Sequence, residues 1–578
     1  MATGGILMLK GIAASQGIAI GPAYLVKETG QNLPRYSLAA EKIPAEKERL
    51  QRAFSATQRQ LEAIRDSLAR QGGQQEAAIF DAHLLLLADP MLVDAVSAFL
   101  DQGLNAEAAV RDAGENCAAL FAALEDEYLR GRGADILDIC SRWLNNLLGA
   151  APSPLDNLGR PAVIFARHLA PSHTAQMDKA KVLALVTETG SRTCHSAIIA
   201  RALEIPAIVG TGSFGQNLRD GCTVIVDGDA GQVFVDPTPE LLREYSQRQQ
   251  QEISRREKLG ELMGLPAETR DGKTFQLAAN ISSPGDVERA LANGAQGVGL
   301  YRTEFLYMER PDLPTEEEQI HAYRTVLEAF PRQPVIIRTL DIGGDKELPS
   351  LQTERELNPF LGNRGIRLCL ARPEIFKIQL RAILRAGTAG TPWIMLPMVT
   401  VPEEVWRTKT ILKEAESELK AEGLPFTSAY KLGIMIEVPA AAIQARFFAG
   451  EVDFFSIGTN DLIQYTCAAD RTNEKVSRLS DPFNPAVLNL IAGVIRAGHE
   501  QGKTVGMCGE MAADPLATPL LVGMGLDEFS LSASAIPRLK ATIRTLDSAR
   551  CQELWQKARE LGEGRQISRL LEEQAKKQ

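Results

Sequence analysis

The sequence predicts a multidomain α/β protein, in which a small α/β domain with an inserted α-helical subdomain precedes a C-terminal (β/α)8 TIM-type barrel. Three observations support this prediction. The chain has 578 residues, which is more than one hydrophobic core usually organises. Helical periodicity dominates residues 35–148 and separates two groups of short β segments. After residue 262, short apolar segments alternate with helical stretches, as they do around parallel sheets.

The small α/β domain is predicted from two separate stretches, residues 1–26 and 149–236. The first contains GIAAS and GIAIGPAYLV, and the second contains PAVIFA, VLALVTE, AIVG, TVIVDG and QVFVD. We expect these segments to complete one sheet, which makes the helices of residues 35–148 an insertion. Those helices carry apolar residues at helical spacing, as in EKERLQRAFSATQRQLEAIRDSLARQ.

Residues 237–261 are highly charged and almost free of Gly and Pro, which predicts a solvent-exposed linker helix. Residues 262–578 then contain eight apolar strand candidates, and eight strand–helix units fit a (β/α)8 barrel. A doubly wound open sheet is the structural alternative. The eight segments are LAANIS, GVGLYRTE, VIIRTLDIG, WIMLPMV, LGIMIEVP, FFSIGTND, TVGMCGE and EFSLSA.

Composition excludes several classes of function. The net charge of −10 argues against a general binder of nucleic acid or anionic membranes. No apolar run approaches the roughly 20 residues that cross a bilayer, so we expect no membrane insertion. The N-terminus has no signal-peptide layout and the eight cysteines form no CxxC pair, which predicts reduced thiols and a cytoplasmic location.

Polar residues recur where the predicted barrel strands end. Active sites of such barrels lie at these C-terminal strand ends. Several arginines at one rim suit a ligand rich in phosphate and carboxylate oxygens, because the guanidinium fork matches both. The residues at the strand ends or on the segments that follow them are Arg302, Glu304, Arg338, Asp341, Arg364, Arg367, Glu437, Thr459, Asn460, Asp461, Arg471, Cys508 and Glu510.

Two kinds of side chain in this set could carry chemistry. Glu437 and Asp461 could bind Mg²⁺, which favours one or two carboxylates together with phosphate oxygens, or could simply neutralise the arginines. Cys508 lies in GMCGE at the expected barrel mouth. Its thiol could exchange a proton with a substrate, although a single cysteine can equally be a packing residue.

A second candidate site lies at His195, which follows the polar loop GSRTC and begins a predicted helix. The N–H groups and positive dipole end of a helix disfavour imidazolium, so the ring would be neutral and nucleophilic. The same groups would stabilise a phosphoryl group on the ring. The alternative is a buried or capping histidine without chemistry.

In combination, these segments resemble the PEP-utilising enzymes, over essentially the whole chain. The loop GSRTCHSAIIAR resembles the family's phosphorylated-histidine loop, and DFFSIGTNDLIQYTCAADR resembles the segment with its PEP and metal contacts. GLYRTEFLYM, RTLDIGGDK, NPFLGNRGIR, IMIEVP and GMCGEMA resemble its other active-site strands. Two departures touch no expected catalytic role: Ser191 replaces a small Gly or Ala, and Cys467 replaces a larger apolar residue.

The resemblance implies a role for each matching residue. His195 is the phosphoryl acceptor through Nε2, and Cys508 protonates the enol carbon. Glu437 and Asp461 bind Mg²⁺ as the cofactor. The expected PEP-binding residues are Arg302, Arg338, Arg364, Asn460, Asp461 and Arg471.

The resemblance also implies a phosphotransferase activity and its partners. The expected reaction is PEP-dependent autophosphorylation on a histidine, followed by transfer to a histidine-containing phosphocarrier protein, the first step of a PEP-dependent sugar phosphotransferase system. The helical subdomain would dock the carrier, the phosphohistidine domain would swivel on the linker, and the barrel would form a homodimer. Alternatives are a pyruvate phosphate dikinase-like enzyme, which needs an ATP-binding domain that nothing here resembles, a PEP-sensing regulatory protein and a catalytically silent scaffold.

Overall fold

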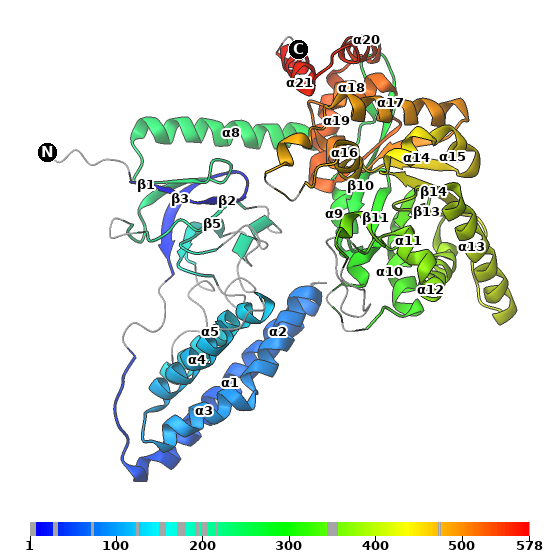
Figure 1. Cartoon of the computed structure of the whole chain (residues 1–578). Coiled ribbons are helices and arrows are strands. Elements are labelled where there is room, and N and C mark those ends of the chain that lie inside the picture. The colour runs from blue at the N-terminus through cyan, green and yellow to red at the C-terminus, as the bar shows by residue number, and fades with distance from the viewer. Residues whose placement is uncertain are drawn as a thin grey trace. The chain divides into compact units, whose positions relative to one another are not determined.

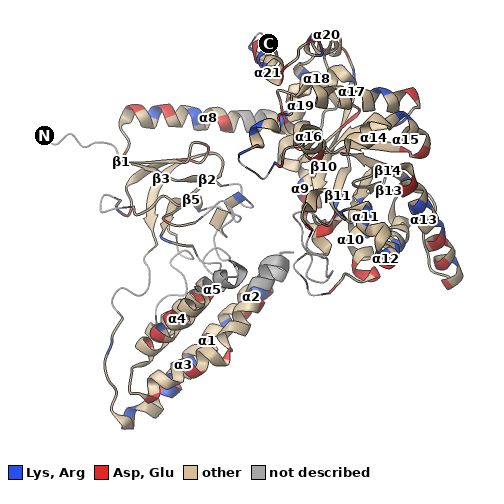
Figure 2. Ribbon diagram, viewed as in Figure 1, with Lys and Arg blue, Asp and Glu red and all other residues tan. Residues whose placement is uncertain are grey.

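The structure is a computed structural model, and its chain divides into two compact units, Met1–Arg255 and Arg256–Gln578 (Figure 1). Each unit is described below by itself. The boundary falls within helix α8 (Pro239–Glu261), whose described part carries charged residues of both signs (Figure 2). The residues described are 7–26, 33–70, 74–122, 127–149, 158–169, 181–190, 196–197, 200–201, 205–214, 218–308, 310, 312–343, 356–471, 473 and 475–576.

The first unit contains an eight-stranded sheet, counted over its described residues, with the strand order β1-β8-β7-β3-β4-β5-β6-β2. N-terminal strands pair with strands that follow the helical segment: β1 with β8, β2 with β6, and β3 with β4 and β7. The two predicted groups of β segments therefore form one sheet, and the helices are an insertion. The strands are β1 Leu7–Lys10, β2 Ile12–Ser15, β3 Ile18–Leu25, β4 Ala162–Ala166, β5 Val182–Thr187, β6 Ala207–Val209, β7 Thr223–Asp227 and β8 Gln232–Val235.

The inserted helices pack around a hydrophobic core of their own. Trp143 is almost fully buried in it and contacts Phe54 edge-to-face, with ring centroids 5.3 Å apart. Asp89 caps α3 by accepting a hydrogen bond from the main-chain N–H of Met91. The helices are α1 Ile43–Arg70, α2 Gln74–Leu87, α3 Pro90–Asp101, α4 Ala106–Ala122 and α5 Glu127–Leu148.

The second unit is built on a closed barrel of parallel strands. Neighbours pair in the order β10 to β17, and β11 pairs again with β10, which closes the sheet. Closure confirms the predicted TIM-type barrel and rules out the doubly wound alternative. All eight predicted segments supply a strand: β10 Thr274–Ile281, β11 Val298–Arg302, β12 Val335–Arg338, β13 Pro392–Leu396, β14 Lys431–Ile436, β15 Phe454–Ile457, β16 Thr504–Met507 and β17 Glu528–Ser532. The short strand β9 (Ala267–Glu268) pairs antiparallel with β10.

Helices cover the outside of the barrel and bury its largest hydrophobic core against the strands (Figure 1). A smaller cluster fills the interior, in which Trp393 lies against Phe454 with ring centroids 4.9 Å apart. Side chains therefore fill the interior of the barrel, as is usual for this fold. The helices are α9 Val287–Ala292, α10 Glu316–Ala329, α11 Ile366–Ala371, α12 Pro373–Ala386, α13 Pro402–Glu422, α14 Pro439–Ile443, α15 Ala445–Glu451, α16 Thr459–Cys467, α17 Pro485–Glu500, α18 Thr518–Met524, α19 Ile536–Thr545, α20 Ser548–Ala558 and α21 Gly564–Ala575.

One further property concerns membrane-spanning potential. Over the described residues, no single helix is both long and apolar enough to cross a bilayer. Taken together, the two helical segments Phe80–Leu87 and Pro90–Asp101, which are bent relative to each other, are long and apolar enough to cross a bilayer. Leu92, Val96 and Leu100 of this pair are, however, buried in the hydrophobic core of the helical subdomain.

Candidate active site at the mouth of the barrel

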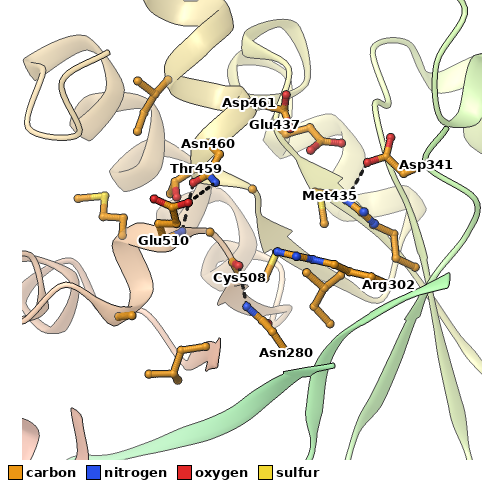
Figure 3. Close-up of a pocket in the computed structure, with 18 of the residues that line it drawn as sticks. Asn280, Arg302, Asp341, Met435, Glu437, Thr459, Asn460, Asp461, Cys508 and Glu510 are labelled. Atoms are coloured by element: carbon orange, nitrogen blue, oxygen red, sulfur yellow. Dashed lines mark hydrogen bonds and ion pairs between the residues drawn. The ribbon is translucent and has the colours of Figure 1, made fainter. Parts of the chain in front are cut away.

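A cavity of about 910 Å³ opens where the barrel strands end (Figure 3). It lies entirely within the second unit, from Asn280 on β10 to Ser532 on β17. The cavity contains the residues expected to bind PEP or metal and Cys508, whereas Arg367 does not line it and donates instead to the main-chain oxygens of Leu361 and Gly362 and to Thr400. Glu304 also lies outside the lining, and His195 lies outside the described residues. The predicted residues that line the cavity are Arg302, Arg338, Arg364, Glu437, Asn460, Asp461, Arg471 and Cys508.

Two of the arginines are buried and held by carboxylates. Arg338, which ends β12, donates from Nη2 to Glu304 Oε1 at 2.6 Å and lies 2.9 Å from Asp341 Oδ2. Arg364 donates to Asp341 and, through Nη1 and Nη2, to both carboxylate oxygens of Asp461. Burial acts to lower the pKa of Arg364, but its two carboxylate partners raise it on balance. These two cations are therefore fixed parts of the cavity wall.

The other two arginines are exposed. Arg302 ends β11 and Arg471 follows α16, and both side chains line the cavity. Across the part of the chain that the structure describes, neither guanidinium donates a hydrogen bond or joins an ion pair. Their donors are therefore available to an anion that enters the cavity.

Glu437 lies at the end of β14 and is 1% exposed. Its Oε1 accepts a 2.6 Å hydrogen bond from the main-chain N–H of Met398, a residue with the unusual φ of 60°. Burial, followed by the negative charges of Asp461 and Asp341, raises the pKa of Glu437 above its ordinary value. The carboxylate thus lies among like charges that a cation would offset.

The carboxylates of Glu437 and Asp461 are suitable ligands for Mg²⁺, because carboxylate oxygens are its preferred protein ligands. Within the described ranges, no group of three or more His, Cys, Asp or Glu side chains is arranged to hold a metal ion. Glu437 and Asp461 therefore supply at most a two-carboxylate site, and Asp461 shares its oxygens with Arg364. Such a site is completed by oxygens of a bound ligand or of water.

Asn460 lies in the first turn of α16, on the side of the cavity opposite Arg302 (Figure 3). Its Nδ2 donates to Glu510 Oε1 at 3.3 Å, and its Oδ1 accepts from the main-chain N–H of Glu510 at 3.2 Å. This pair connects the ends of β15 and β16, from which Asp461 and Cys508 also come.

Cys508 follows β16 and is 4% exposed. Burial raises the pKa of its thiol to about 11, so the thiol is protonated near neutral pH. A protonated thiol that borders an arginine-lined cavity can donate a proton to a carbanion or enolate bound there.

The surroundings of His195 are described only at their edges. Gly190, the first residue of the loop GSRTC, has φ 130°, a value that favours glycine. Ser196 is buried, and its Oγ donates to the main-chain oxygen of Leu169 at 3.4 Å. Residues 196–197 and 200–201 are helical, in agreement with the helix predicted to begin at His195.

The sequence assigns no role to several other residues near the site. Glu304, Asp341 and Glu510 lie at the predicted strand ends, but their pairing with arginine or asparagine depends on side-chain positions that the sequence does not give. Asn280, at the end of β10, lines the cavity and could have been found by the same strand-end argument. Met398 carries no sequence signal for its positive φ.

Comparison with known proteins places this site in a family. The closed barrel with an arginine-rich cavity at its mouth defines a protein of the TIM-barrel class, with a candidate site for an anionic ligand. Three family models match in order along the chain: "PEP-utilising enzyme, N-terminal" over residues 10–132, "PEP-utilising enzyme, mobile domain" over 158–231 and "PEP-utilising enzyme, PEP-binding domain" over 256–548. The chain belongs to the PEP-utilising enzymes.

Three similar curated proteins share the name phosphoenolpyruvate-protein phosphotransferase. The protein of that name from Geobacillus stearothermophilus is 48% identical over 94% of this chain and 95% of its own. The one from Staphylococcus carnosus is 46% identical over 98% of this chain and 99% of its own. The one from Bacillus subtilis is 46% identical over 95% of this chain and 96% of its own.

Proposed function

We propose that the chain is a PEP-dependent protein phosphotransferase, which phosphorylates itself on His195 and passes the phosphoryl group to a histidine-containing phosphocarrier protein. This would be the first step of a PEP-dependent sugar phosphotransferase system. The observation that carries the proposal is one cavity lined by Arg302 and Arg471, which are unpaired among the described residues, together with buried carboxylates and Cys508. The name shared by the similar full-length proteins supports it.

PEP combines a phosphate and a carboxylate, and this matches two exposed guanidinium groups in one cavity. We assign the first contacts with these anionic groups to Arg302 and Arg471, because neither must break an ion pair to make them. Asn460 would add an amide donor. Arg338 and Arg364 would contribute charge from the wall, where carboxylates already hold them in place.

Mg²⁺ would be held by Glu437 and Asp461 together with oxygens of the phosphate. When bound, the ion supplies positive charge that stabilises the transferring phosphoryl group. The like-charge environment of Glu437 supports this assignment, since a cation offsets the repulsion that raises the pKa of Glu437.

In the proposed reaction, Nε2 of His195 attacks the phosphorus atom of PEP in line with the bond to the enol oxygen. The new N–P bond forms as the P–O bond breaks, and the guanidinium groups stabilise the charge that builds up. The enolate then takes the proton of the Cys508 thiol on its terminal carbon and becomes pyruvate.

His195 must meet PEP and then the carrier protein, so the phosphohistidine domain would have to move. We assign the movement to the linker helix, and we keep the four-part division of the chain as a prediction. Its parts are residues 1–26 with 149–236, residues 35–148, residues 237–261 and residues 262–578.

Carrier docking, dimerisation and location complete the proposal. The helical subdomain exposes Leu85 and Leu120, at 75% and 61%, which suits a protein partner. On the barrel, Trp406 and Phe447 are exposed beside each other, with ring centroids 6.5 Å apart. Ile443, four residues before Phe447, is also exposed, and these apolar side chains support a homodimer through that unit. A cytoplasmic location follows from the proposed substrate and carrier.

The test is incubation with radiolabelled PEP and Mg²⁺, followed by addition of a histidine phosphocarrier. We expect an acid-labile label on the chain that moves to the carrier. A label that moves to no carrier would favour the regulatory or dikinase-like alternatives, and no label would favour a silent scaffold.

A further inference from the structure

Asn280, at the end of β10, makes a contact that spans three consecutive barrel strands. Its Nδ2 donates to the main-chain oxygen of Cys508 at 3.1 Å, shown by the dashed line in Figure 3. Strand β17 lies between β10 and β16, so the side chain reaches past a whole strand to this oxygen. On β17, Ser530 is fully buried and donates from Oγ to Asn280 Oδ1 at 2.6 Å.

The orientation of the Asn280 amide is fixed by these two partners. A main-chain oxygen can only accept a hydrogen bond, so Nδ2 must face Cys508 and Oδ1 must face Ser530. Both ends of the amide are thereby used, and the short distance to Ser530 limits its movement.

The main chain of Cys508 is held on its other side as well. Its N–H donates to the oxygen of Ile457 at 3.1 Å, and a side chain added at Gly509 would collide with Thr459. The Cys508 side chain has one rotatable bond before sulfur, and Sγ itself donates to the main-chain oxygen of Ile457 at 3.8 Å. The position of Sγ therefore depends on this contact and on where the Cys508 main chain lies. The Asn280 amide is the contact that fixes the carbonyl side.

We propose that Asn280, oriented by Ser530, is a positioning residue that holds Cys508 for protonation of the enolate. The inference rests on the proposed function and adds a residue to it. In the step concerned, the S–H bond breaks and its electron pair stays on sulfur. The enolate carbon–carbon π electrons form the new C–H bond, and the enolate oxygen becomes the ketone oxygen of pyruvate. Solvent water returns a proton to the thiolate.

The proposal predicts that phosphoryl transfer and protonation can be separated. Single-turnover reactions with labelled PEP would follow the label on the protein, while proton NMR follows the vinyl hydrogens of PEP and of released enolpyruvate. We expect Asn280→Ala to take up label at nearly the wild-type rate but to form pyruvate at least about tenfold more slowly, with free enolpyruvate accumulating. Cys508→Ala should give the same pattern in a stronger form.

Three further variants sharpen the test. Asn280→Asp should match Asn280→Ala, because a carboxylate cannot donate to the Cys508 oxygen, and Ser530→Ala should give an intermediate loss. Asn293→Ala is the matched control, since Asn293 also donates to a main-chain oxygen, that of Arg289, but lies at the end of α9 and outside the cavity lining. It should behave as the wild type.

The proposal is overturned if Asn280→Ala forms pyruvate as the wild type does, or if labelling and pyruvate formation fall by the same factor. If Asn280→Ala does not fold, Ser530→Ala decides between the same outcomes. Failure of the proposed function is a different result: the wild type would take up no label, or Cys508→Ala would form pyruvate at the wild-type rate.

Discussion

Arg364 donates two hydrogen bonds to Asp461, from Nη1 to Oδ1 at 3.0 Å and from Nη2 to Oδ2 at 3.2 Å. The two residues are 97 positions apart and come from segments that follow different barrel strands. The remaining edge of the same guanidinium donates to Asp341. One planar group therefore connects two carboxylates of the cavity wall, a geometry that a lysine ammonium cannot reproduce.

Substitution at Arg364 should therefore affect stability as well as activity. We expect Arg364→Met to lower the free energy of unfolding by about 3–5 kcal/mol, because buried carboxylates lose their partner. Arg364→Lys keeps the charge and should cost less, about 1–3 kcal/mol. Chemical denaturation measures both changes. Arg372→Lys is the control, since Arg372 pairs with Glu374 at the surface and should change stability by less than about 0.5 kcal/mol. Equal losses of unfolding free energy at Arg364 and Arg372 would contradict a stabilising role for the ion pairs of Arg364.

The exposed arginines should show the opposite pattern. Because Arg302 is unpaired in the described structure, Arg302→Gln should leave the free energy of unfolding within about 0.5 kcal/mol of the wild-type value. The apparent affinity for PEP should fall by about tenfold or more, since a charge-assisted hydrogen bond to the ligand is lost. Arg471→Gln should do the same. Titration of labelling with PEP gives the affinity, and an unchanged affinity in both variants would exclude these arginines from PEP binding.

Substitution of Glu437 should weaken Mg²⁺ binding without lowering the stability of the fold. Burial and its carboxylate neighbours destabilise its charged form, so Glu437→Gln should leave stability at pH 8 unchanged or raise it. The Mg²⁺ concentration that gives half-maximal labelling should rise by about tenfold or more, because one of two carboxylate ligands is lost. Chelation of Mg²⁺ should abolish labelling of the wild type. A variant that is destabilised yet keeps its Mg²⁺ dependence would contradict this account.

Glu528 provides a pH prediction that is independent of the cavity. It is a buried residue of β17, and burial followed by the charge of Asp527 raises its pKa from 4.5 to about 7. Between pH 4.5 and about 7, the folded chain keeps the proton on Glu528 while the unfolded chain releases it. The contribution of Glu528 to the free energy of unfolding should therefore be most favourable below pH 4.5. Stability should then fall between pH 4.5 and about 7, by roughly 3 kcal/mol at most.

Glu528→Gln should remove this part of the pH dependence and raise stability at pH 8. The free energy of unfolding can be measured from denaturation curves at several pH values. Tryptophan fluorescence reports on the unit that contains Glu528, because Trp393, Trp406 and Trp555 all lie in the second unit. Parallel pH profiles for variant and wild type between pH 4.5 and 7 would show that Glu528 does not contribute.

Much of the fold was predictable because strand periodicity and strand-end chemistry are local. All eight barrel segments form strands, and Arg302, Glu437 and Cys508 reach one cavity because parallel strands end at the same rim. The insertion of the helices was predictable from the return of β segments after residue 150.

Other features depend on distances that a sequence does not contain. Arg302 and Arg338 both end strands, yet one is exposed and the other is held by Glu304 and Asp341. The reach of Asn280 to Cys508 requires the order of strands in the closed barrel. The positive φ of Met398 accompanies a main-chain hydrogen bond to Glu437, which lies 39 residues further along the chain. The role of His195 was inferred from a loop that lies outside the described residues, and it stays a prediction.

The most direct test of the central claim is the location of the phosphoryl group after reaction with radiolabelled PEP and Mg²⁺. The account predicts acid-labile label on the wild type, none on His195→Ala, and undiminished binding of PEP to that variant. Label that persists on His195→Ala would contradict the assignment of His195 as the nucleophile.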